Sequence, residues 1–223
     1  MTFDARPSPA RVSAAAAARL PRWVLWTLLA AYGLAGLFGR DPWFQDDAAG
    51  FGVMWTMARG TAADWLLPNV LGAFVAEEGP LPFWVGAVFV YALGPVLGEA
   101  FAARLTTVLW LTVGAAALWY ATYRLARREE AQPVTFVFGG EAKARDYGRM
   151  LADIALLLML GTVGIVPRLH EITAETAAVA MVAAVLYGLA STMDGARRGP
   201  IIAGAALGAV ALSRGLTPAT FLL

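Results

Sequence analysis

Two adjacent carboxylates, Asp46 and Asp47, stand in the stretch RDPWFQDDAAGFG at residues 40–52, just after the first apolar run. Trp43 and Phe44 precede them. A carboxylate at the outer end of a membrane helix can act as a general base or bind a hard divalent cation. A solvated acidic turn is the alternative, because surface acids are usually there for solvation. We interpret both residues as candidate catalytic carboxylates.

A second acidic pair, Glu77 and Glu78, precedes the proline-rich stretch GPLPFW at residues 79–84. Two acids in this place can cap the helix that follows, because negative charge is favourable at a helix N-terminus. They can also join Asp46 in a cleft and contact a substrate. The spacing favours capping and leaves the binding role open.

The only histidine, His170, stands beside Glu171 in the segment PRLHEITAE at residues 167–175. A histidine next to a carboxylate can form an acid–base or metal-binding pair. Alternatively, Thr173 caps the next helix and Glu175 lies in its first turn. Both interpretations can hold together.

In the later segments, Arg168 and Arg214 are the basic residues predicted to lie nearest to the face that carries Asp46. A planar guanidinium group suits a phosphate or pyrophosphate ligand. The alternative is an interfacial anchor whose charged head reaches water. The sequence contains no P-loop, nucleophile elbow, zinc-protease or dinucleotide motif. It also has no cysteine, which excludes disulfides, thiol catalysis and cysteine metal sites.

The elements that position these residues are predicted to be membrane helices. The chain is 59% hydrophobic and 15% charged, with a mean hydropathy of +0.63, whereas a soluble domain is about 25% charged. About 20 apolar residues cross a bilayer. The sequence predicts an all-α, polytopic membrane helical bundle with a cytoplasmic tail at 1–22 and spans at about 23–39, 105–123, 150–167, 176–193 and 199–213.

The first apolar run has a cleavable signal peptide as its alternative. We favour a retained helix, because the run is longer than a signal-peptide core and Arg40-Asp41-Pro42 follows it in place of a cleavage site. At the other end, residues 216–223 begin an apolar run that stops short. We therefore expect the chain to be truncated at its C-terminus.

Charge decides the topology of the remaining apolar run, 79–98. If this run does not span and the N-terminus is cytoplasmic, twelve of the 17 basic residues lie inside, in 1–22, 124–149 and 194–198. Nine of the 16 acids then lie outside, in 40–104 and 168–175. This distribution obeys the positive-inside rule, and a spanning 79–98 would reverse it.

The segment 40–104 is therefore predicted to be a long extracytoplasmic loop that carries interfacial helices at Ala48–Ala58 and within 79–98. Prolines and glycines at the ends of 79–98 are expected to shorten its regular helix to about a dozen residues. Four tryptophans of this loop fit the headgroup level of a bilayer, where tryptophan is enriched.

The two loop motifs resemble a known family. WFQDDAAGFG at 43–52, EEGPLPFW at 77–84 and Leu-Ser-Arg-Gly at 212–215 are similar to stretches in the N-terminal half of GT-C membrane glycosyltransferases. The likeness is closest to glycosyltransferase family 39 in the broad sense, with the aminoarabinose transferases and protein O-mannosyltransferase relatives. It extends over nearly the whole chain in topology.

The resemblance implies transfer of a sugar from a polyprenyl-phosphate donor to a lipid, protein or glycan acceptor, in a multi-pass protein of the bacterial inner membrane. It assigns the catalytic carboxylate to Asp46 and a second acid to Glu175, where the family usually has Asp. A divalent cation held by Asp46 and Glu175 is the cofactor considered. The family carries a phosphate-binding Lys where this chain has Glu78, and Arg168 or Arg214 could replace its charge.

Glu77, Glu78, Arg168, His170, Glu171 and Arg214 are accordingly the candidate substrate-binding residues. The alternative function is a catalytically inactive GT-C-like scaffold or assembly subunit. A flippase or transporter fragment is disfavoured, because charged residues are nearly absent from the predicted spans. Membrane lipid is an expected partner. The net charge of +1 by itself says nothing about nucleic acid, and no nucleic-acid partner is expected.

Overall fold

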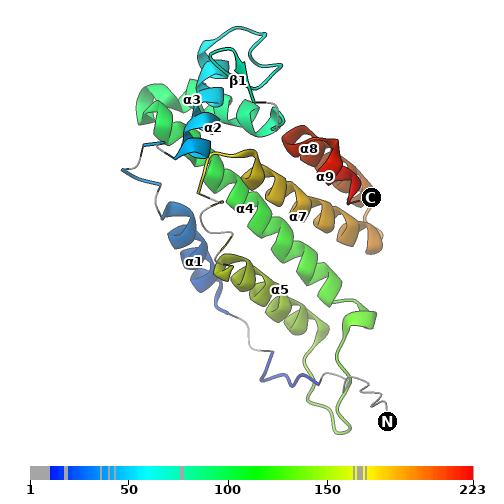
Figure 1. The fold of residues 1–223 in the computed structure, drawn as a ribbon. Coiled ribbons are helices and arrows are strands. Elements are labelled where there is room, and N and C mark those ends of the chain that lie inside the picture. Colours follow the sequence, from blue (N-terminus) through cyan, green and yellow to red (C-terminus); the bar gives the residue numbers. More distant parts are fainter. Residues whose placement is uncertain are drawn as a thin grey trace, which may run out of the picture.

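The computed structural model describes residues 11–17, 20–35, 37–39, 41–42, 44–75, 78–162, 164, 168 and 170–222, and these form a mostly helical structure (Figure 1). The predicted all-α class is confirmed, with one small hairpin added to it. The α-helices are α1 (Arg22–Leu34), α2 (Gln45–Arg59), α3 (Leu81–Leu97), α4 (Glu99–Ala126), α5 (Ala144–Gly161), α7 (Ala174–Met193), α8 (Gly199–Arg214) and α9 (Leu216–Thr220). A 3-10 turn, η1, spans Glu129–Ala131.

The hairpin pairs β1 (Asn69–Val70) with β2 (Ala73–Phe74) in antiparallel register. It lies in the segment that the sequence assigned to the long first loop. Gly72 and Leu71 occupy its turn with positive φ angles of 89° and 51°, a conformation that glycine adopts readily and most residues rarely adopt.

The long helix α4 is the centre of the bundle. It packs against α7 on one flank and α5 on the other, and α8 covers the far side of α7 (Figure 1). Small residues allow these helices to approach closely: Gly114 of α4 faces Ala180 of α7, and Gly188 of α7 faces Ala203 of α8. Small residues at helix interfaces are typical of packing in membranes.

Among the described residues, two helices, α4 and α7, are long and apolar enough to cross a membrane, and α3 and α8 are shorter apolar helices. The predicted spans 105–123 and 176–193 lie within α4 and α7, and 199–213 lies within α8. The predicted span 23–39 is shorter in the structure, because α1 ends at Leu34. For 150–167, α5 ends at Gly161, and residues 163 and 165–167 lie outside the described residues.

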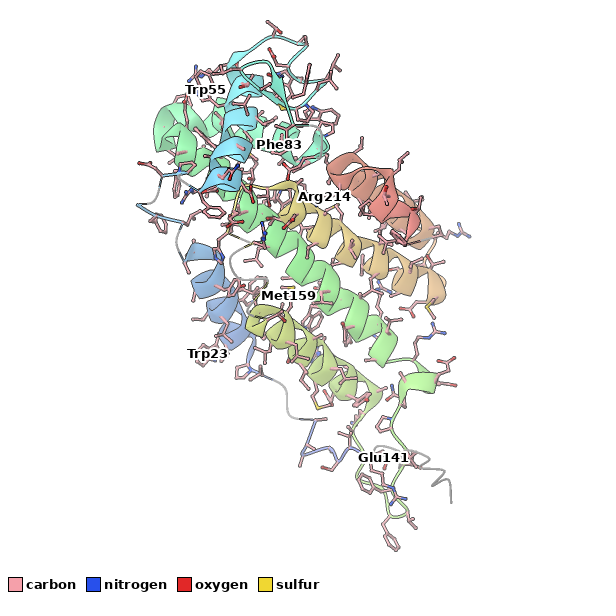
Figure 2. All side chains as sticks on the ribbon, in the orientation of Figure 1. Trp23, Trp55, Phe83, Glu141, Met159 and Arg214 are labelled. Atoms are coloured by element: carbon pink, nitrogen blue, oxygen red, sulfur yellow. The ribbon has the colours of Figure 1, made fainter. Side chains whose placement is uncertain are left out.

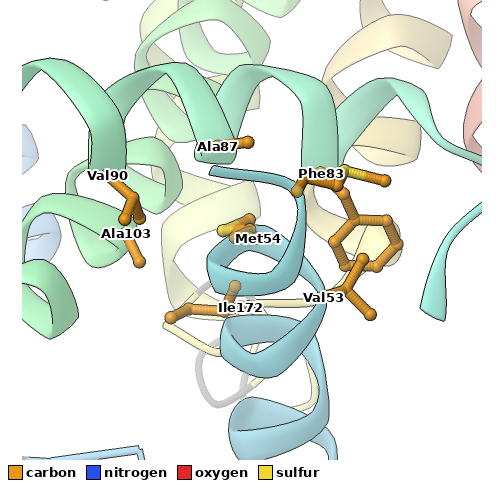
Figure 3. Packing of buried hydrophobic residues seen from close by; sticks show 8 residues of the cluster. Val53, Met54, Phe83, Ala87, Val90, Ala103 and Ile172 are labelled. Atoms are coloured by element: carbon orange, nitrogen blue, oxygen red, sulfur yellow. The ribbon is translucent and has the colours of Figure 1, made fainter. Parts of the chain in front are cut away.

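At one end of the bundle, α2 and α3 pack across the start of α4 and form a compact apolar cluster (Figure 3). Met54 of α2, Phe83 of α3 and Ile172, which precedes α7, are fully buried in it. Full burial of one such side chain stabilises the fold by about 1.5–3 kcal/mol. Gly86 faces Met54 so closely that a Cβ would overlap with its sulfur. The cluster fixes α2, and with it the acidic pair at its start.

The helix α3 is longer than the dozen residues expected from its prolines. It has 17 residues, because Pro82 lies in the first turn, where its missing N–H is not needed. Pro95 lies inside the helix near its end, and Gly98 terminates α3 with a φ of 89°. Where α3 lies relative to a membrane stays a prediction.

Candidate functional site

The two adjacent aspartates lie in the first turn of α2, where negative charge is favourable. Successive residues of a helix point in different directions, and the side chains of these two residues differ strongly in burial. The side chain of Asp47 has no exposed surface, whereas that of Asp46 is 52% exposed. The same acidic pair therefore supplies one interior carboxylate and one surface carboxylate.

Asp47 forms a buried ion pair with Arg104 of α4. Its Oδ2 lies 2.9 Å from Nη2 of Arg104, whose side chain is only 3% exposed. The Oδ1 of Asp47 accepts a hydrogen bond of 2.9 Å from the backbone N–H of Ile172. Asp47 thus ties α2 to α4 and to the segment before α7.

This segment can approach α2 because residue 50 is glycine. A Cβ at Gly50 would overlap with the carbonyl oxygen of Ile172. Gly79 has the same function at a second junction, where a Cβ would overlap with the carbonyl oxygen of Leu212. The N–H of Gly79 donates a hydrogen bond of 2.8 Å to the carbonyl of Ser213. Close backbone approach at two glycines joins α2 to the segment before α7 and the segment before α3 to the end of α8.

Arg168 is the centre of a second group of charged side chains, which are more exposed than Asp47 and Arg104. Its Nη1 lies 3.4 Å from Oδ2 of Asp46 and 3.5 Å from Oε2 of Glu171, and its Nε lies 3.5 Å from Oε2 of Glu175. The guanidinium group is half exposed. Three of the predicted site residues therefore surround a fourth.

Glu175 extends this group to the end of α8. Its Oε1 lies 3.8 Å from Nη2 of Arg214, and Nη1 of Arg214 lies 3.6 Å from Oε1 of Glu78. Figure 2 shows Arg214 where α8 ends beside the start of α7. The structure thus brings Asp46, Glu78, Arg168, Glu171, Glu175 and Arg214 into one chain of ion pairs, which we call the acid–arginine network.

Glu78 is the least exposed carboxylate at the Arg214 end of this network. Its Oε1 accepts a long hydrogen bond of 3.4 Å from the backbone N–H of Ala174. Burial raises the pKa of Glu78 above its usual value; the hydrogen bond from Ala174 and the charge of Arg214 oppose this rise in pKa, whereas Glu175 and Asp46 add to it. Glu78 therefore holds a proton more readily than an ordinary surface glutamate.

His170 contacts α1. Its Nε2 donates to the carbonyl oxygen of Tyr32 at 2.7 Å, and the two rings lie 5.2 Å apart. His170 therefore connects this loop to α1, and the binding role predicted for it stays a prediction. Glu77 lies outside the described residues.

Arg168 contacts both of the carboxylates that were predicted to hold a divalent cation. Asp46 and Glu175 offer suitable oxygen ligands, but the guanidinium group of Arg168 lies within 3.5 Å of both. Among the described residues no group of three or more His, Asp or Glu side chains could hold a metal ion. The positive charge at this place is supplied by arginine, and the predicted cation stays untested.

Arg104 is the residue that the sequence analysis missed. An arginine six residues inside α4, a helix apolar enough to span a membrane, is costly unless it is paired. The sequence analysis placed residue 104 at the end of the first loop, outside the predicted span 105–123, so this cost became visible only when the structure placed the start of α4 at Glu99. Asp47 supplies the buried acid that the arginine requires.

No family model, curated protein or solved structure matches the chain. The GT-C resemblance therefore rests on the motifs themselves.

Proposed function

We propose that this chain is a GT-C-like membrane glycosyltransferase of the bacterial inner membrane. It moves a sugar from a polyprenyl-phosphate donor to a lipid, protein or glycan acceptor at the extracytoplasmic face. One observation carries the proposal: the exposed carboxylate of Asp46 lies 3.4 Å from Arg168, and Glu175 connects Arg168 to a second arginine. A base and two phosphate-binding cations are thus adjacent.

Asp46 is the proposed general base. The acceptor hydroxyl attacks the anomeric carbon of the donor, a new C–O bond forms, and the bond from that carbon to the lipid phosphate breaks. The hydroxyl proton passes to Asp46, and the bonding electrons leave with the phosphate oxygen. Arg168 and Arg214 stabilise the charge on the departing phosphate, which is an electrostatic contribution to catalysis.

Charge balance gives Glu78 a part in this scheme. Four carboxylates share two guanidinium groups in the network, so an incoming phosphate meets an excess of negative charge. The raised pKa of Glu78 makes it a carboxylate that takes up a proton more readily, and its protonation lessens this excess and weakens its contact with Arg214. Glu78 thereby accommodates the phosphate where the family carries a lysine.

Asp47 is assigned a supporting role in this proposal. Its carboxylate has no exposed surface and already accepts hydrogen bonds from Arg104 and the Ile172 backbone. We infer that it holds α2 in place, so that Asp46 keeps its position beside Arg168.

The second candidate function is an inactive scaffold. It is favoured by the same ion pairs, because each arginine of the network already has carboxylate partners. Such a network could hold segments together with no substrate.

Asp46→Asn separates the two functions. Membranes that contain the expressed protein are incubated with a panel of radiolabelled polyprenyl-phosphate hexoses and pentoses. The release of polyprenyl phosphate is then measured. We expect the variant to lose about a hundredfold or more of the rate, as for removal of a general base. Its unfolding temperature should change little, because an exposed ion pair contributes about 1 kcal/mol or less. The control is Asp41→Asn, which changes an exposed aspartate outside the network.

A wild-type protein that cleaves no donor of the panel, together with an Asp46→Asn variant that folds as the wild type does, supports the scaffold. Full transfer by Asp46→Asn contradicts the base assignment.

The proposed topology has an independent test. The natural chain has no cysteine, so single cysteines at positions 60 and 130 report their own side of the membrane. A membrane-impermeant maleimide should label position 60 in intact spheroplasts and position 130 only after lysis. Labelling of both from one side overturns the placement of 40–104 outside.

A further inference from the structure

An apolar cavity of about 410 Å³ lies between α1 and α4, with one wall completed by α5. From α1 it is lined by Leu25, Leu29 and Gly33, and from α4 by Val108, Leu111 and Ala115. It extends along α1 from Arg22 to Gly33, a length of about 16 Å at the rise of an α-helix. That length is about half of the ~30 Å hydrocarbon thickness of a bilayer, which corresponds to one leaflet.

A more polar cavity of about 370 Å³ continues from the first, with which it shares Arg22, Leu25 and Trp119. It adds Arg149 and Asp153 of α5. This polar end lies at the start of α1, the end of the bundle opposite to α2 and α3 (Figure 1). It is therefore separate from the acid–arginine network.

The arginines of this polar end are the groups available to a ligand. Asp153 is buried, and its carboxylate accepts hydrogen bonds of 2.8 Å from Nε1 of Trp119 and 3.4 Å from the N–H of Leu20. Within the described part of the chain, no ion pair joins Arg22 or Arg149 to a carboxylate. Two guanidinium groups at the mouth of an apolar groove complement an anion that carries a hydrocarbon chain.

We propose that this groove binds one acyl chain of an anionic phospholipid, whose headgroup phosphate lies between Arg22 and Arg149. Basic pockets between membrane helices on the cytoplasmic side are known to bind anionic headgroups. Trp23 and Trp26 are exposed on α1 beside the polar end (Figure 2 labels Trp23). Tryptophan is enriched at the headgroup level, so these residues place the arginines at that level as well.

The distribution of charge along the groove favours a lipid as its occupant. The walls formed by α1 and α4 are mostly apolar, and the charged groups stand only at the end where the two cavities meet. One hydrocarbon chain with an anionic headgroup matches both parts.

The test is lipid binding by the purified full chain in maltoside micelles, followed by native mass spectrometry. Dioleoyl-phosphatidylglycerol and dioleoyl-phosphatidylcholine are titrated separately. We expect tight binding of one phosphatidylglycerol. Arg22→Gln and Arg149→Gln should each weaken it about fivefold, from about 1 kcal/mol per arginine near a lipid surface. Arg149→Lys should recover most of the affinity, and Arg145→Gln, on the same helix outside the cavities, should leave it unchanged.

A second pair of variants tests the acyl-chain groove itself. Ala30→Trp should fill the groove and abolish retention of the lipid, whereas Ala31→Trp, on the adjacent exposed position outside the lining, should preserve it. Helical circular dichroism of each variant verifies folding. Equal retention of both lipids by all variants overturns the proposal. So does a dimer that dissociates in Ala30→Trp and carries no bound lipid.

Discussion

Two layers of charged residues lie one above the other at the α2 end of the bundle, and they differ in their contact with solvent. In the lower layer, Asp47 and Arg104 are almost completely buried and 2.9 Å apart. In the upper layer, Asp46 and Arg168 are each about half exposed and 3.4 Å apart. Neighbouring residues of one sequence motif thus enter two different kinds of ion pair.

The difference separates stability from function. A buried charge that loses its partner is strongly destabilising, whereas an exposed pair contributes little to the free energy of unfolding. The lower layer can therefore hold α2 in position without taking part in the proposed reaction. The upper layer can change its partners at little cost to the fold, as the proposed function requires.

Arg104→Met should produce the largest loss of stability. It leaves the Asp47 carboxylate buried without its cation, which costs about 3–5 kcal/mol. The measurement is thermal unfolding in detergent, with Arg168→Met as the matched variant of the upper layer. The upper-layer variant should lose about 1 kcal/mol or less.

The double variant Asp47→Leu with Arg104→Met sharpens this result. Replacing both partners of a buried pair by apolar residues is often nearly neutral, so the double variant should recover much of the stability. A double variant as unstable as Arg104→Met alone would show that the pair's charge is not what matters.

Gly50→Ala should have a smaller effect. Its Cβ would overlap with the Ile172 carbonyl oxygen, and overpacking of this kind costs typically about 1–3 kcal/mol. Gly204→Ala is the control, because a Cβ there meets no atom within 4 Å and Gly204 lies within α8. The control should stabilise by up to about 1 kcal/mol through helix propensity. Equal effects of both substitutions would contradict the close approach at Gly50.

The smallest effect is expected from Glu78→Gln, and it depends on pH. Because the pKa of Glu78 is raised in the folded protein, the folded state binds more protons than the unfolded state between the ordinary and the raised pKa. The wild type therefore loses stability as pH rises through that window. The glutamine variant lacks this loss. The difference in unfolding temperature, variant minus wild type, should thus increase with pH, and a difference independent of pH would contradict the raised pKa.

The helices were largely predictable, because long apolar runs bounded by charges determine them. α7 and α8 agree closely with the predicted runs. The predicted length of α3 was wrong, because the position of a proline in a helix matters more than its presence. The hairpin at 69–74 has only two residues in each strand, too few to leave an alternating pattern.

The meeting of site residues was only partly predictable. Residue type and predicted sidedness grouped Asp46, Glu175 and Arg214, but neither could show which of two adjacent aspartates faces the solvent. That choice depends on the rotation of α2, which the contact between Met54 and Gly86 fixes. The same rotation turns Asp47 toward Arg104.

The sequence separation of these contacts sets the order in which a nascent chain can complete them. Asp47 and Arg104 are 57 residues apart, whereas Asp46 and Arg168 are 122 apart. At about 5–20 residues per second of synthesis, roughly 6–24 s pass between Asp46 and the arginine that faces it. The interior pair is available earlier. A chain still on the ribosome can thus hold its first helices together before its surface carboxylate gains a counter-charge.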